Sequence, residues 1–92
     1  MKYNIRGEKV EITSAIRSYI EEKIGKLDKY FDDASDITAS VVIKVRGNEQ
    51  KIEITVPAMR YTLRSEEAHS DLYAAIDLTV DKLERASSLL KV

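Results

Sequence analysis

Two short segments place basic side chains at helical spacing. Lys82 and Arg85 lie three residues apart in DKLER, and Lys26 and Lys29 lie three apart in KLDKY. Residues three apart are neighbours on a helix surface, so each pair would present two cations side by side. Such pairs could bind the phosphates of a nucleic-acid backbone. They could equally be solvated residues that favour the negative end of a helix dipole.

The charges on the two expected helices are sorted by sign. At about 100° per residue, the last helix carries one acidic flank, made of Asp77, Asp81 and Glu84. Lys82 and Arg85 fall on its opposite flank. In the first helix, Lys26 and Lys29 share one flank, whereas Arg17 lies on the other among acidic residues. A basic stripe that spans two helices is therefore one interpretation of the pattern.

Side chains for catalysis or metal binding are sparse. The chain has no cysteine, which excludes disulfides and thiolate chemistry. Its one histidine, His69 in EEAHSD, is expected in a loop or cap, because a general base needs a positioned nucleophile or carboxylate. Asp32, Asp33 and Asp36 fit no EF-hand spacing and indicate a solvated acidic loop. We therefore expect no enzyme activity, no metal, no cofactor and no small-molecule substrate.

The composition suits one domain with balanced charge. The chain has 92 residues, and 15 Lys and Arg residues nearly cancel 16 Asp and Glu residues, for a net charge of −1. Any basic surface must therefore come from segregation of charge. The N-terminal MKYNIRGEKVE lacks the apolar run of a signal peptide, and no segment approaches the length of a membrane span. We expect a cytoplasmic protein with no membrane partner.

Hydrophobic periodicity predicts the elements that would position these cations. Alternating residues indicate strands over 2–7, 37–45, 52–56 and 61–65, with Gly47-Asn48 as a hairpin turn. Thr13 caps a helix from Ser14 to about Phe31, and Ser70 or Asp71 caps another. The order β-α-β-β-β-α predicts an α+β two-layer sandwich, with two helices on one face of a four-stranded mixed sheet.

Two surfaces of this sandwich bear on function. No aromatic side chain is expected on the outer face of the sheet, because Tyr3 and Tyr61 share the parity of the core residues. A sheet that stacks RNA bases needs exposed rings, so any RNA would be held by its backbone and shape. In the last helix, the apolar arc that should be buried comprises Leu72, Ile76, Val80, Leu83 and Leu90.

Three stretches together resemble the ribosome hibernation-promoting factor family. They are RGEKVEITSAIRSYIEEKIGKLDKYF at 6–31, ITVPAMRYTLRSEE at 54–67 and DLYAAIDLTVDKLER at 71–85. This family includes the ribosome-associated inhibitor A proteins and was once labelled sigma-54 modulation. The resemblance covers residues 1 to about 85, and it implies the same β-α-β-β-β-α fold.

The resemblance also implies a function. Family members bind the small ribosomal subunit and its 16S-type rRNA in the channel for messenger and transfer RNA, and block translation by occlusion under stress. Their RNA-contacting residues map onto Lys26 and Lys29 in KLDKY, and onto Lys82 and Arg85 in DKLER. Weaker candidates are Arg17 and Lys23, the latter at the edge of the apolar arc, where its stem lets the ammonium reach solvent.

Two departures from the family pattern leave an alternative open. Family members usually follow K-L-E-R with glutamine and more cations, whereas this chain has ASSLLKV. The N-terminal half is most like that of long members, so we expect residues 1–92 to be a monomeric ribosome-binding domain without their C-terminal dimerisation domain. The alternative is a truncated or engineered domain with little RNA affinity, a protein-interaction module or scaffold with Leu89 and Leu90 capping the core. A continuous positive groove between the helices would favour RNA binding.

Overall fold

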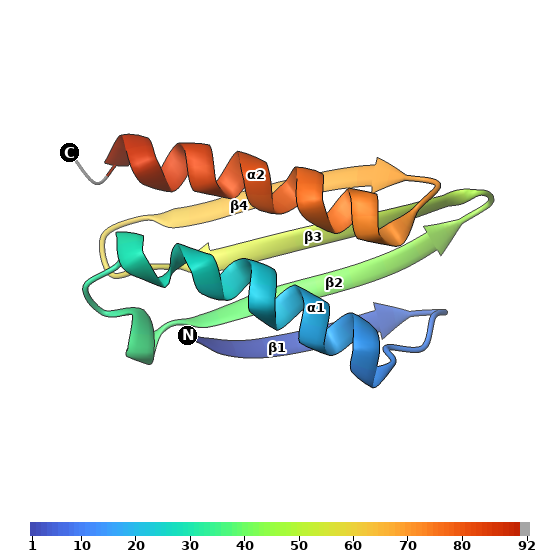
Figure 1. Ribbon diagram of the computed structural model, residues 1–92, viewed down its shortest axis with the longest axis horizontal. Coiled ribbons are helices and arrows are strands. Elements are labelled where there is room, and N and C mark those ends of the chain that lie inside the picture. Colours follow the sequence, from blue (N-terminus) through green and yellow to red (C-terminus); the bar gives the residue numbers. More distant parts are fainter. Residues whose placement is uncertain (91–92) are drawn as a thin grey trace.

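The computed structural model describes residues 1–90. Its strands are β1 (Lys2–Glu8), β2 (Thr38–Arg46), β3 (Glu49–Pro57) and β4 (Thr62–His69). Its helices are α1 (Ser14–Gly25), the 3-10 helices η1 (Lys26–Tyr30) and η2 (Ala34–Asp36), and α2 (Leu72–Leu90). The strands form one sheet in the order β1-β2-β3-β4, with both long helices on one face (Figure 1). The predicted fold class is confirmed.

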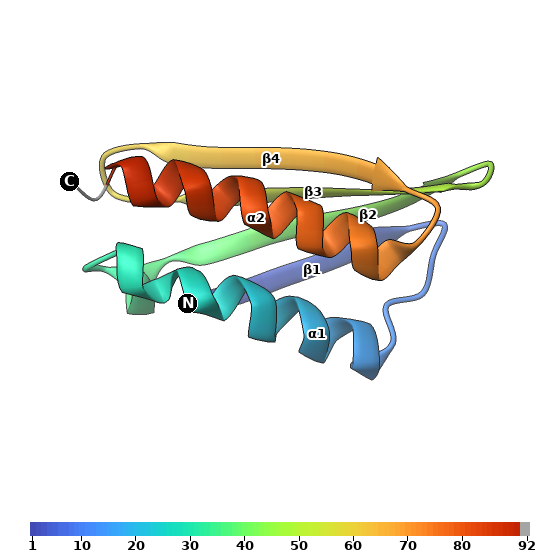
Figure 2. The ribbon, with the colours of Figure 1, turned by 45° about the horizontal axis from the view of Figure 1, so that its top comes forward.

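The sheet pairing follows from the connections between strands. β1 pairs parallel with β2 across the α1 crossover, with Ile5 opposite Val41. β2, β3 and β4 form an antiparallel meander. The β2–β3 hairpin turns at Gly47, whose φ of 59° lies in the left-handed region that glycine tolerates best. The helices lie side by side and run in the same direction, so their C-terminal ends share one end of the molecule (Figure 2).

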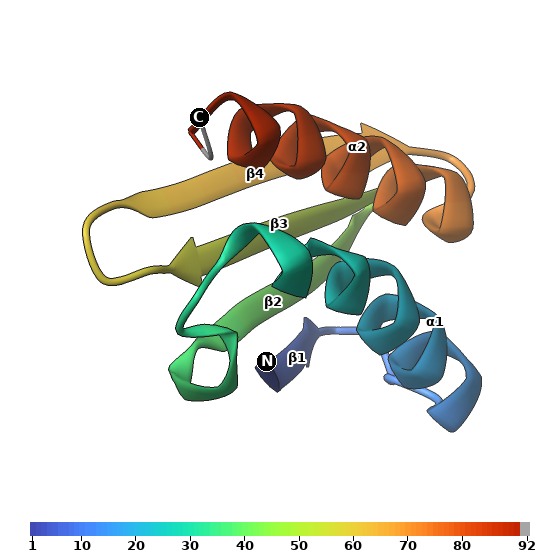
Figure 3. The same ribbon diagram turned by 60° about the vertical axis from the view of Figure 1, so that its left-hand side comes forward.

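The core lies between the sheet and the helices. Alternate residues of the two central strands are fully buried, namely Ala39, Val41, Ile43, Ile52, Ile54 and Val56. They pack against Ile20 and Ile24 of α1 and against Ile76 and Leu83 of α2. The opposite face of the sheet is uncovered (Figure 3), and Tyr3 and Tyr61 pack toward the core as expected. Ion pairs cross that open face, joining Arg6–Glu8, Lys44–Glu8, Lys51–Glu66 and Arg64–Glu53.

The first helix is shorter than predicted. The α-helical segment ends at Gly25, and the chain continues in the tighter turns of η1 to Tyr30. Glycine is a poor helix former, and the Tyr3 hydroxyl lies only 3.3 Å from where a β-carbon of Gly25 would be. Leu27 and Phe31 are nevertheless buried. Apolar spacing did not reveal the change, because a short 3-10 segment keeps nearly the same face buried.

The end of α2 also differs from the prediction. Leu90, expected on the buried arc, is 50 % exposed, and Leu89 is 77 % exposed. Ser87 occupies the buried position instead, and its hydroxyl donates to the Leu83 carbonyl at 2.7 Å. This bond satisfies the buried hydroxyl within the helix. Leu89 and Leu90 therefore do not cap the core.

The single histidine stabilises the turn that leads into α2. His69 is the last residue of β4 rather than a loop residue. Its Nδ1 accepts the backbone N–H of Asp71 at 2.9 Å, and Asp71 Oδ1 accepts the N–H of Tyr73 at 2.9 Å. Asp71 thus provides the predicted cap. The imidazole supports the turn.

Candidate nucleic-acid interface

A polar cluster joins the two helices in the N-terminal half of α2. The Tyr19 hydroxyl donates to Asp77 Oδ1 at 2.6 Å, and Lys23 Nζ lies 3.6 Å from the same oxygen. The rings of Tyr19 and Tyr73 pack edge to face, with centroids 4.8 Å apart. The hydrogen bond to Asp77 raises the pKa of Tyr19, and the charge of Asp77 raises the pKa of Lys23. Lys23 is therefore a cation whose charge is already paired.

The acidic flank of α2, not its basic flank, faces α1. Asp77 contacts α1 through Tyr19 and Lys23. On the other flank, Lys82 forms an ion pair with Glu67 of β4, at the edge of the sheet. The groove between the helices is thus interrupted by a carboxylate, and Lys82 points away from it.

Three candidate cations are exposed in the part of the molecule where the helices end. Lys26 and Lys29 are exposed on η1, which contacts α2, and Arg85 is exposed in the C-terminal half of α2. Lys29 Nζ lies 5.2 Å from the centre of the Tyr30 ring. Among residues 1–90, none of the three cations forms an ion pair. Their charges remain available at the end of the molecule that holds both helix C-termini, and we call this region the open end.

Arg17 lies apart from the other candidates. It is exposed on α1, two residues before Tyr19, which faces α2. Two residues correspond to about 200° around a helix. Arg17 therefore points away from α2. The six candidate side chains divide into three at the open end, two in internal ion pairs and one on the far flank of α1.

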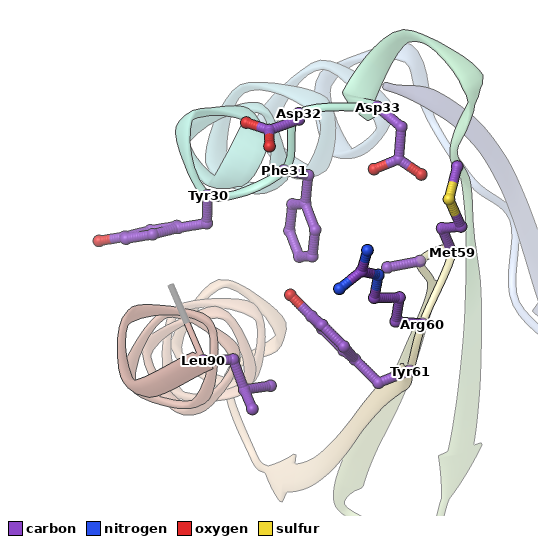
Figure 4. Close-up of a pocket in the computed structure, with 9 residues that line it drawn as sticks. Tyr30, Phe31, Asp32, Asp33, Met59, Arg60, Tyr61 and Leu90 are labelled. Carbon is purple, nitrogen blue, oxygen red and sulfur yellow. The ribbon is translucent and has the colours of Figure 1, made fainter. Parts of the chain in front are cut away.

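A cleft at the open end escaped the sequence analysis. It has a volume of about 570 Å³ and is lined by Tyr30, Phe31, Asp32, Asp33, Ala58, Met59, Arg60, Tyr61 and Leu90. Figure 4 shows Phe31 and Tyr61 pointing toward each other, with the Arg60 guanidinium beside them. The cleft joins three segments that are distant in sequence. The only local signals are the adjacent aromatic residues in KYF and the MRY after Pro57.

Residues 1–90 contain no cluster of three side chains that could hold a metal ion. No helix within this range is long and apolar enough to cross a membrane.

Comparisons with known proteins agree with the resemblance noted from the motifs. A family profile described as "Sigma 54 modulation protein / S30EA ribosomal protein" matches residues 3–87. Two similar proteins are named "Ribosome hibernation promotion factor". The one from Lactococcus lactis is 54 % identical over 86 residues, and the one from Staphylococcus aureus is 51 % identical over 86. These matches cover 92 % of this chain but only 46 % and 45 % of the relatives, so the chain spans less than half their length.

Solved structures extend the comparison to the fold. The N-terminal domain of Protein Y from Thermus thermophilus superposes with a TM-score of 0.90 at 40 % identity, covering 98 % of this chain and 99 % of that one. A ribosomal subunit interface protein from Coxiella burnetii shares the fold, with a TM-score of 0.86 at 22 % identity. The superposition covers 99 % of this chain and 98 % of that one. None of these names describes an enzyme, in agreement with the prediction. The chain belongs to the Sigma 54 modulation protein / S30EA ribosomal protein family.

Proposed function

We propose that this chain binds the small ribosomal subunit, contacts its RNA in the channel for messenger and transfer RNA, and prevents translation by occupying that channel under stress. Family membership and the names of the relatives support ribosome binding. One observation supports RNA as the contact: Lys26, Lys29 and Arg85 are exposed at the open end without ion pairs among residues 1–90. Occlusion requires only binding, so it needs no catalytic group.

The internal ion pairs lead to a quantitative expectation. Phosphate binding releases counterions, with a log–log salt slope of roughly −0.7 to −0.9 per contact. The three available cations would give a slope of about −2 to −3. If Lys23 and Lys82 also exchange their carboxylate partners for phosphates, five contacts would give about −3.5 to −4.5. The measured slope therefore reports whether Asp77 and Glu67 release their partners.

The test is cosedimentation of the protein with purified small subunits over a range of salt concentrations. We expect binding at low salt that weakens steeply as salt rises. The triple variant Lys26→Gln, Lys29→Gln, Arg85→Gln should lose most of its affinity. The matched control is Lys2→Gln, Lys9→Gln, Arg46→Gln, three exposed cations that also lack ion pairs among residues 1–90. Equal loss in both triples would show that net charge, not the open end, directs binding.

The interrupted groove favours a second candidate, a module that keeps the fold but has little RNA affinity. Asp77 places a negative charge between the helices, and the net charge of the chain is −1. Absence of cosedimentation at low salt, with a cooperative thermal transition intact, would favour this candidate over the first.

A further inference from the structure

The cleft at the open end combines aromatic walls with the polar side chains of Asp33 and Arg60. We propose that it takes one unpaired nucleobase of single-stranded RNA. The proposal rests on the proposed function for its partner. It adds a base-binding site to a surface that otherwise offers cations for phosphates.

The dimensions and walls of the cleft suit a flat ring. Its volume of about 570 Å³ falls within the range of small-molecule sites, roughly 300–1,000 Å³. Phe31 and Tyr61 have ring centroids 6.3 Å apart and an interplanar angle of 41°, and Tyr30 and the exposed Met59 add further apolar surface. Unstacked RNA bases bind proteins mainly by stacking on such side chains.

Polar groups in the cleft match the edge of a base. The Arg60 guanidinium projects into the cleft beside Phe31 and Tyr61, and the Asp33 carboxylate points toward it (Figure 4). An arginine can donate two hydrogen bonds to O6 and N7 of guanine, and a carboxylate accepts from base amino groups. The cleft therefore offers hydrogen-bond donors and an acceptor next to an aromatic wall. Guanine fits this set, because it has acceptors for the arginine and an amino group for the carboxylate.

The cations of the open end adjoin this cleft. Tyr30 lines it, and Lys29 lies over the Tyr30 ring. Leu90, at the end of α2, lines it from the other helix. A nucleotide seated here would thus place its phosphates near the cations that the proposed function requires. Among residues 1–90, no aromatic side chain points outward from the open face of the sheet, so that face offers no comparable ring for a base to stack on.

Salt dependence separates base contacts from phosphate contacts. Tyr30→Leu keeps an apolar side chain but removes the ring, and Arg60→Gln changes an exposed residue that the core does not need. We expect Tyr30→Leu to weaken small-subunit binding by roughly 5- to 150-fold, as loss of base stacking does. Arg60→Gln should weaken it as well, and neither variant should change the salt slope. The control is Tyr73→Leu, a half-exposed tyrosine at the other end of α2, which should bind like the wild type.

Two outcomes would overturn the base site. One is unchanged affinity in both variants. The other is weaker binding by Tyr30→Leu together with a slope smaller by about 0.7–0.9, because the ring would then act only by positioning Lys29 for a phosphate.

A second measurement does not depend on ribosomes. Guanosine 5′-monophosphate, titrated at millimolar concentration into the labelled protein, should shift the amide resonances of Phe31, Arg60 and Tyr61. Inorganic phosphate should leave them in place. If the wild type fails to cosediment while the nucleotide still shifts the cleft, the proposed function fails and the base site stands. If the protein cosediments while nucleotide and phosphate have the same effect, the base site fails alone.

Discussion

Two regions along the helix pair use the same residue types to opposite effect. Where Asp77 of α2 faces α1, Lys23 and Asp77 neutralise each other, and the rings of Tyr19 and Tyr73 pack edge to face. At the open end, Lys26, Lys29 and Arg85 have no carboxylate partner within residues 1–90, and the rings line a cleft. The comparison shows that a cation's position on a helical wheel does not establish its availability. Tertiary contacts with neighbouring elements decide it.

The largest expected effect concerns the packing of α2 against the core near the open end. Leu83 is 1 % exposed and lies between Lys82 and Arg85 on the core side of α2. We expect Leu83→Ala to lower the free energy of unfolding by about 2–5 kcal/mol, through lost burial and a residual cavity. Denaturant unfolding would measure this loss. Leu89→Ala is the control, since Leu89 is exposed, and a similar cost for both would show that the last turns of α2 pack differently.

The next effect concerns the polar cluster of Tyr19, Lys23 and Asp77 between the helices. Tyr19→Phe removes the hydrogen bond to Asp77 and should lower the free energy of unfolding at neutral pH by about 0.5–1.5 kcal/mol. Because the pKa of Tyr19 is raised above its ordinary 10.0 in the folded protein, its stabilising contribution is complete below pH 10. The contribution is then lost as pH rises through the folded pKa.

Unfolding measured at several alkaline pH values checks this sign. The difference in stability between wild type and Tyr19→Phe should shrink above pH 10. A constant difference over that range would mean that Asp77 does not hold the hydroxyl in its neutral form.

Extending the open end should strengthen binding. Leu89 lies about one turn past Arg85 and is 77 % exposed, so Leu89→Lys adds a cation without removing core atoms. We expect tighter small-subunit binding, on the order of 1 kcal/mol at low salt, and a slope steeper by just under one unit. The melting temperature should stay unchanged. Lower thermal stability with no gain in affinity would assign Leu89 a structural role.

The smallest expected effect comes from a substitution that removes the carboxylate partner of a paired cation and so leaves that cation available for RNA. Glu67→Gln removes the partner of Lys82 and should tighten binding by about 0.2–1 kcal/mol, the usual range for an ion pair at the protein surface. The neighbouring Glu66→Gln is a matched control, because Glu66 pairs with Lys51 on the open face of the sheet. Salt-dependent cosedimentation of both variants would compare them. Equal gains would point to net charge rather than to Lys82.

Much of the fold could be predicted because its signals are local. Alternation in β2 and β3, the Gly47 turn and the Thr13 cap each depend on residues within one element or its border. The change from α-helix to 3-10 helix at Gly25 could not be predicted from the sequence, because Leu27 is buried in either geometry. The burial of Ser87 in place of Leu90 could not be predicted either. A serine is expected on the surface because it is polar, but here its hydroxyl donates a hydrogen bond to a carbonyl within the helix.

The site was less predictable than the fold. The motifs identified Lys26, Lys29 and Arg85 as candidates, and the structure places them at one end of the helix pair. The pairing of Lys82 with Glu67 and of Lys23 with Asp77 depends on which flank of each helix meets its neighbour. That orientation follows from the packing of distant segments. The cleft also depends on this packing, because its walls include Tyr30 from the helical layer and Tyr61 from the sheet layer.

The ion pairs on the open face of the sheet have a consequence for handling the protein. Each of these four pairs has at least one side chain that is less than half exposed, but all lie at the surface, where each contributes little to stability. At molar salt the Debye length falls to about 3 Å, which would strip phosphate contacts and weaken these pairs together. The isoleucine-rich core is insensitive to such screening. A high-salt wash should therefore release the protein from ribosomes still folded and ready to rebind after dilution.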